Sequence, residues 1–147
     1  YQQQLSFLPG WAKGVGVYTN YGYTQTEGDY GGTVVRTTRS LAGFLNKNGN
    51  VGLSYRGYGL DLRLQAVYRG NYLITNSITP ALLIYQKAKT TWNLKARYDV
   101  MKRLTLFLDV ENLFEEPLND RYALYRDRVR FYATFHTKIN AGFTGRF

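Results

Sequence analysis

Residues 130–147 read RFYATFHTKINAGFTGRF, and this stretch decides the fold. From Phe131 onward, alternate positions carry apolar or small residues, and the positions between them are mostly polar. The first set comprises Phe131, Ala133, Phe135, Thr137, Ile139, Ala141, Phe143, Gly145 and Phe147. A period of two predicts a β-strand with one apolar face. The stretch exceeds the usual strand of about 5–6 residues, and it fits a tilted strand that crosses a bilayer, which needs about 9–11 residues.

The composition agrees with a membrane protein built from strands. Aromatic residues make up 16% of the 147 residues, with 14 Tyr and 8 Phe, although the mean hydropathy is below zero. Alternating strands combine these two properties, because polar residues separate the apolar ones and girdles of Tyr and Trp mark the membrane interfaces. No apolar run approaches the roughly 18 residues of a membrane helix. Cysteine is absent, which excludes disulfides and thiolate metal sites.

Alternation recurs along the chain and predicts an all-β fold of seven antiparallel strands. Leu60–Arg69 alternates most regularly, and the other expected strands are 1–7, 11–24, 48–56, 92–99, 104–113 and 131–147. Short turns (8–10, 57–58 and 101–103) alternate with long loops (25–47, 71–86 and 114–127), and 81–85 is expected to extend a strand above the membrane. Short turns on one side and long loops on the other are typical of outer-membrane barrels.

The strand count predicts that this chain is part of a larger barrel. Bacterial outer-membrane barrels usually have an even number of strands, whereas the first and last of seven antiparallel strands run in the same direction. We therefore expect residues 1–147 to be one C-terminal segment of a transmembrane β-barrel. The chain starts with Tyr1, followed by three Gln, without the basic start and apolar core of a signal peptide. We expect the signal peptide to lie outside this segment.

The polar faces of these strands carry charges of both signs, which we expect to line the barrel lumen. The expected lumen residues are Arg63, Arg69, Lys95, Arg97, Asp109, Glu111 and Lys138. When the inward faces of the two strands joined by the turn at 101–103 are aligned, Lys95 lies opposite Asp109 and Arg97 lies diagonal to Asp109. This arrangement favours charge compensation over a catalytic pair formed by Asp109 and Glu111. His136 is the one histidine, and without convergent partners it is interpreted as a polar lining residue.

The hairpin turn at 57–58 has Gly first, as a type II′ turn requires. This placement predicts that Ser54 pairs with Asp61 and that Leu53 lies beside Leu62. A slip of one residue would turn every leucine of Leu60–Arg69 into the lumen, because side chains alternate between the two faces.

Three stretches resemble the C-terminal end of TonB-dependent outer-membrane receptors: YQQQLSFLPGWAKGVGVYTNYGY at 1–23, LTLFLDVENLFEEP at 104–117 and INAGFTGRF at 139–147. In the second, Glu111 stands where Asn is usual. The third resembles the barrel-assembly signal, carried here by Asn140, Gly142 and Phe147, although Gly145 replaces the aromatic residue often found there.

The resemblance implies a barrel of roughly 22 strands closed by a plug domain, in the outer membrane of a Gram-negative-type bacterium. The plug is expected outside this segment. Such a receptor imports a scarce solute, siderophore-like, a cofactor or a carbohydrate, with energy from TonB. The implied partners are the lipid bilayer, the rest of the barrel with its plug, TonB and the barrel-assembly machinery.

The net charge of +9 is compatible with nucleic acid, anionic lipid or an anionic solute as partner, and the positive charges in the long loops point to an anionic solute. Its expected contacts in the long loops are Arg36, Arg39, Tyr125 and Arg126. The chain shows no nucleophile elbow, phosphate loop or metal-ligand cluster, so we expect no enzyme activity, no cofactor and no metal.

Two other functions compete with the receptor interpretation. A free-standing small barrel, acting as an adhesin or a structural protein, is opposed by the odd strand count. A soluble basic β-protein could bind single-stranded nucleic acid through aromatic stacking and charge. It is opposed by the placement of most aromatics on the face opposite the charges, so no nucleic-acid partner is expected.

Overall fold

The computed structural model describes residues 1–28, 41–75, 77, 79–122, 124–125 and 127–145. Seven strands form one sheet in the order β1-β2-β3-β4-β7-β8-β11, and every neighbouring pair is antiparallel. They are β1 Gln2–Gln4, β2 Val15–Tyr23, β3 Lys47–Gly57, β4 Leu60–Arg69, β7 Lys89–Met101, β8 Leu104–Glu111 and β11 Lys138–Gly145. The expected all-β fold with seven strands in sequence order is confirmed.

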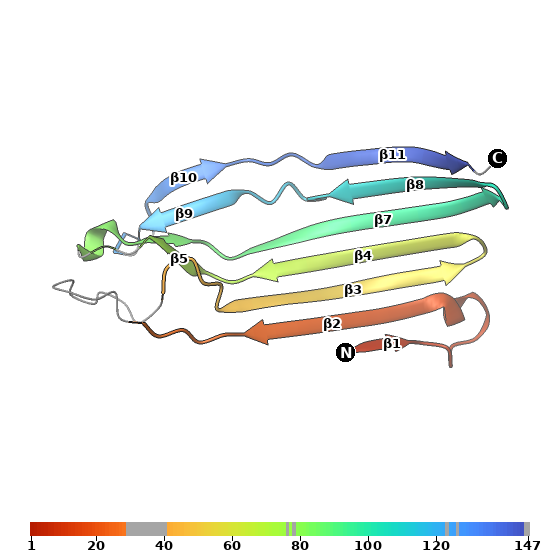
Figure 1. The fold of residues 1–147 in the computed structure, drawn as a ribbon, viewed down its shortest axis with the longest axis horizontal. Coiled ribbons are helices and arrows are strands. Elements are labelled where there is room, and N and C mark those ends of the chain that lie inside the picture. The colour runs from red at the N-terminus through yellow and green to blue at the C-terminus, as the bar shows by residue number, and fades with distance from the viewer. Residues whose placement is uncertain (29–40, 76, 78, 123, 126, 146–147) are drawn as a thin grey trace.

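The short turns lie at one end of this sheet and the long connections at the other (Figure 1). The helical segments of the described residues are two 3₁₀ turns, η1 Gly10–Gly14 and η2 Pro80–Leu82. No helix in this part of the chain is long and apolar enough to cross a membrane. Strand β1 is shorter than the expected 1–7, and the η1 turn replaces the expected beginning of the second strand at Trp11.

The register aligns the apolar residues of neighbouring strands across the sheet. One row of direct cross-strand partners contains Val17, Leu53, Leu64, Leu94, Val110 and Ile139. Directly opposed side chains on neighbouring strands lie on the same face, with Cβ atoms about 4.5–5.5 Å apart. Leu53 is 53% exposed and Ile139 is 65% exposed. Val110, in contrast, is 7% exposed, and Val17, Leu64 and Leu94 are half-buried, so this apolar face is most open at β3 and β11.

The turn of the β3–β4 hairpin lies one residue later in the chain than predicted. Tyr58 and Gly59 form the turn, with φ values of 52° and 76°, and Gly57 pairs with Leu60. Positive φ at both central residues is the requirement of a type I′ turn, whose twist matches that of the strands. Ser54 consequently faces Arg63, and Leu53 faces Leu64. Because the partners shift by two residues, each side chain stays on its expected face.

We predict that Gly59→Ala lowers the free energy of unfolding of the complete protein by about 1–2 kcal/mol, the cost of a left-handed conformation for a residue with a Cβ. Gly57→Ala is the matched control, since Gly57 is a strand residue and an added Cβ would meet the movable end of the Tyr55 side chain. Urea unfolding in detergent, followed by the gel mobility of unheated samples, measures both variants. Equal losses would contradict the type I′ assignment.

A second sheet lies in two connections predicted to be loops and at the start of the terminal stretch. Four strands, β5 Tyr72–Thr75, β6 Ile84–Gln86, β9 Leu118–Tyr122 and β10 Val129–Ala133, pair in the order β10-β9-β6-β5. They lie beyond the long-connection end of the main sheet (Figure 1). Leu73, Leu83 and Ile84 are buried here and give this sheet a small core of its own. The central pairing, β6 with β9, joins the two predicted loops. The strand expected at 81–85 is met in part by β6, whereas Pro80–Leu82 is a 3₁₀ turn.

The terminal stretch is two strands and not the single strand expected from its alternation. β10 pairs with β9, β11 pairs with β8, and residues 134–137 between them belong to no strand. The break lies opposite the point where the partner chain turns after β8, at Asn112 with φ 55°. Where the partner leaves the ladder, the backbone of the terminal stretch needs other hydrogen bonds.

Candidate functional site on the polar face

The charged side chains of the seven-stranded sheet are almost completely segregated onto one face. Register and alternation place the following residues together on this polar face: Arg56, Asp61, Arg63, Arg69, Lys89, Lys95, Arg97, Asp99, Asp109, Glu111 and Lys138. The exception among the strands of this sheet is Lys47, which shares the apolar face with Tyr23 at the long-connection end. All seven residues expected to line a lumen therefore share one face.

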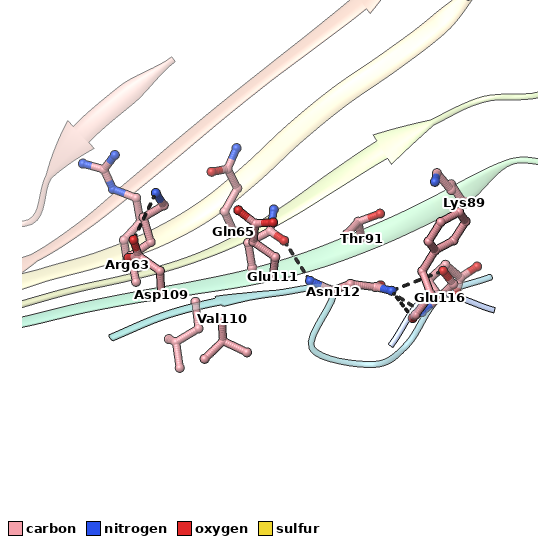
Figure 2. Close-up of a pocket in the computed structure, with 13 residues that line it drawn as sticks. Arg63, Gln65, Lys89, Thr91, Asp109, Val110, Glu111, Asn112 and Glu116 are labelled. Atoms are coloured by element: carbon pink, nitrogen blue, oxygen red, sulfur yellow. Dashed lines mark hydrogen bonds and ion pairs between the residues drawn. The ribbon is translucent and has the colours of Figure 1, made fainter. Parts of the chain in front are cut away.

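The polar face contains a hollow of about 370 Å³ between β4, β7, β8 and the segment after β8. Arg63, Gln65 and Lys89 extend to one side of the strands, whereas Val110 extends to the other (Figure 2). Asp109 and Glu111 contribute carboxylates to the lining. The hollow thus combines cations, anions and neutral hydrogen-bonding groups, and its polar side chains come from several strands.

The predicted pairing of Lys95 with Asp109 is confirmed. These residues are direct cross-strand partners, and Lys95 Nζ lies 3.9 Å from Asp109 Oδ2. Glu111 instead pairs with Lys138 at 3.7 Å, a partner that the sequence reasoning did not assign to it. Both ion pairs are accessible to solvent, with Asp109 the least exposed of the four side chains at 31%, so each pair contributes only about 0–1 kcal/mol. Their effect is to neutralise the two carboxylates, which argues against a catalytic pair.

Arg63 is held beside an aromatic ring. Its guanidinium carbon lies 6.0 Å from the centre of the Tyr18 ring. The ring occupies the space that a side chain at Gly52 would fill, so glycine is required there for this packing. At the short-turn end, Arg56 donates from Nε and Nη2 to the carboxylate of Asp61, at 3.1 and 2.7 Å.

Asn112 connects three segments, a role that was not predicted from the sequence. Its side-chain oxygen accepts a hydrogen bond from the Glu116 backbone N–H at 2.9 Å, and its amide nitrogen donates to the Phe135 carbonyl at 2.7 Å. Its backbone N–H donates to Asn93 Oδ1 at 3.1 Å, and Thr137 Oγ1 donates to its carbonyl at 3.0 Å. Asparagine tolerates the left-handed conformation better than most residues. Asn112 therefore supplies the bonds missing at the break between β10 and β11.

Two of the residues proposed to carry the assembly signal, Asn140 and Gly142, lie on β11. Asn140 pairs with Asp109 and Gly142 pairs with Phe107. A Cβ at Gly142 would lie 2.7 Å from Cζ of the Phe107 ring, so the glycine makes room for that ring. Phe147 lies outside the described residues. Gly142 thus has a packing role that is independent of any signal.

The loop residues predicted to contact a solute are only partly described. Arg36, Arg39 and Arg126 lie outside the described residues. Tyr125 is half exposed, and the Arg128 guanidinium lies 5.3 Å from the centre of its ring. His136 lies in the break between β10 and β11, not on a strand face, with Nδ1 3.4 Å from Glu115 Oε1. Among the residues that the structure describes, no group of three His, Asp or Glu side chains is placed to hold a metal ion.

Comparison with known proteins identifies a family. The family model for the TonB dependent receptor-like beta-barrel matches residues 2–113. Neither the curated proteins nor the solved structures include a significant match to the chain. The matched region contains β1 to β8 and therefore most of the seven-stranded sheet. Because the match covers more than half of the chain, this chain belongs to the family of TonB-dependent receptor β-barrels.

Proposed function

We propose that this chain is a C-terminal segment of the barrel of an outer-membrane receptor that imports a scarce solute with energy derived from TonB. Proteins of the family are transport receptors, typically of the Gram-negative outer membrane, and are not enzymes. The observation that carries the proposal is the separation of the charged side chains from the apolar face across the sheet. In this proposal the apolar face contacts lipid and the polar face lines the lumen.

The height of the apolar face supports its contact with lipid. Aromatic residues lie near both of its ends, with Tyr21 and Tyr68 towards the long connections and Tyr98 and Phe143 towards the short turns. On β4 the apolar face extends from Leu60 to Tyr68. This rise of eight residues corresponds to about 27 Å along the strand. At the usual tilt of about 35–45° this becomes roughly 20 Å, close to the apolar band of about 25 Å in outer-membrane barrels.

The two edges of the sheet support completion by further strands. β1 and β11 are the edges of the seven-stranded sheet (Figure 1). An open edge cannot persist in hydrocarbon, because no water is present to satisfy the free backbone groups. We propose that the remaining strands of the same barrel pair with both edges and that a plug domain fills the lumen. TonB and the barrel-assembly machinery are the further partners of this proposal.

The mass of the mature polypeptide tests this architecture. The chain itself has a mass of 16.9 kDa. A polypeptide of far greater mass, isolated from outer membranes and carrying this sequence, is the expected result. A free-standing 16.9 kDa membrane barrel, or a water-soluble monomer, would refute the proposal.

The solute is proposed to be anionic, with first contacts in the loops. Replacing Arg36, Arg39 and Arg126 together by Gln is expected to lower uptake of an anionic solute several-fold at low salt. The difference should shrink at high salt, because exposed charges are screened beyond about 8 Å at physiological ionic strength. Uptake of labelled ferric citrate and of a labelled neutral saccharide by cells producing the complete receptor measures this. Unchanged uptake of the anion would refute the loop assignment, and a triple Gln variant at Lys13, Lys102 and Arg103 controls for net charge.

A further inference from the structure

Strands β4 and β7 twice place cations directly opposite each other on the polar face. Arg63 faces Lys95, and Arg69 faces Lys89. Like charges in directly opposed positions destabilise a sheet, since their Cβ atoms lie only about 4.5–5.5 Å apart. The register that aligns the apolar rows also fixes these pairs. The cations cannot move to other strand positions without turning apolar residues away from the apolar face.

The two cation pairs differ in how the protein compensates them. In the first pair, Asp109 lies 3.9 Å from Lys95, and the Tyr18 ring faces Arg63. In the second pair, neither Arg69 nor Lys89 has a carboxylate within 4.0 Å among the described residues. Glu116 lines the same hollow as Lys89 without forming such an ion pair. The second pair is therefore the uncompensated one.

The surroundings of the second pair consist mainly of hydrogen-bonding groups. Asn48 is the direct partner of Arg69 on β3, and Thr91 lines the hollow beside Lys89. Arg69 is exposed and Lys89 is half-buried, so both side chains are accessible to a ligand. Arg69 ends β4 and Lys89 begins β7, at the end of the polar face next to the long connections. Under the proposed function, a solute released from the loops reaches this end first.

We propose that Arg69 and Lys89 form a binding site for an anionic group of the transported solute, a carboxylate or a phosphate, at the entrance to the lumen. This inference rests on the proposed function for its solute. The planar guanidinium of Arg69 can donate to two oxygens of such a group, and the ammonium of Lys89 adds a mobile point charge. The bound anion would neutralise the charges of Arg69 and Lys89, as Asp109 neutralises the charge of Lys95 in the Arg63–Lys95 pair.

Anion binding to the complete receptor, purified in detergent, tests the site without TonB or uptake. Isothermal titration at low salt uses citrate as the carboxylate probe and pyrophosphate as the phosphate probe. The double variant Arg69→Gln/Lys89→Gln is expected to bind the preferred probe at least about tenfold more weakly than the natural protein. The double variant Lys102→Gln/Arg103→Gln removes the same charge at the short-turn end and should retain binding within about twofold. Unheated gel mobility confirms that both variants are folded.

The outcomes separate this inference from the proposed function. If the natural protein binds neither probe, or if the two double variants bind equally well, the Arg69–Lys89 site is refuted even where uptake proceeds normally. If binding depends on Arg69 and Lys89 but cells take up no solute through the receptor, the site stands and the proposed transport function fails. The probe that binds more tightly identifies the anionic group: citrate indicates a carboxylate and pyrophosphate indicates a phosphate.

Discussion

Replacing Leu64 by Arg is expected to lower the free energy of unfolding of the complete barrel in liposomes by about 2–4 kcal/mol, the cost of Arg at the membrane midplane on a lipid-facing site. Leu64 lies in the middle of β4, in the apolar row that crosses six strands. The long Arg side chain would have to reach either interface through hydrocarbon. Urea unfolding and the folded fraction on unheated gels measure the loss.

Val67→Arg is the matched control for this prediction. Val67 lies three residues away on the same strand but on the polar face, between Asn50 and Thr91. The same change from an apolar residue to Arg is expected to cost less than about 1 kcal/mol there, because a lumen position is hydrated. If Val67→Arg cost as much as Leu64→Arg, the assignment of the two faces to lipid and lumen would be wrong.

Asn112→Ala is expected to lower the free energy of unfolding by about 3–4 kcal/mol. The substitution removes two good side-chain hydrogen bonds, to Glu116 and Phe135, at about 1 kcal/mol each. It also places a residue with no tolerance for the left-handed region at φ 55°, which costs about 1–2 kcal/mol. The same unfolding assay on the complete protein measures this loss.

Two variants divide the Asn112 effect into its parts. Asn112→Gly removes the hydrogen bonds but relieves the backbone, so it should cost about 2 kcal/mol. Asn112→Asp keeps the acceptor for the Glu116 N–H and loses the donor to Phe135, so its loss should be smaller than that of Asn112→Ala. An Asn112→Ala protein as stable as the natural one would show that this junction does not depend on Asn112.

Strand positions were predictable where each strand pairs with a neighbour across a short turn. The alternation in Leu60–Arg69 identified β4 and its faces, and matching faces across 101–103 paired Lys95 with Asp109. The type I′ turn was missed because Tyr58 adopts positive φ, which the Gly-first pattern of 57–58 did not suggest. Local patterns thus located the strands better than the turns.

Features that depend on pairing between distant segments were not predictable. β6 consists of three residues and pairs with β9, whose residues lie more than thirty positions further along the chain. The strand expected at 81–85 is met only in part by β6, because three residues are too few to show a period or to indicate a partner. The role of Asn112 likewise depends on Phe135, which is brought close by the break between β10 and β11. The LTLFLDVENLFEEP resemblance at 104–117 included this asparagine, but nothing in its local sequence identified its partners.

The pairing of β6 with β9 makes two of the long connections mechanically one body. A displacement of the connection between β4 and β7 must carry the connection between β8 and β11 with it, unless the β6–β9 ladder breaks. Under the proposed function, any movement of one of these connections over a solute would therefore be shared by the other. A substitution that loosens β5 would therefore also be felt at β10, although the two strands lie at opposite edges of their sheet.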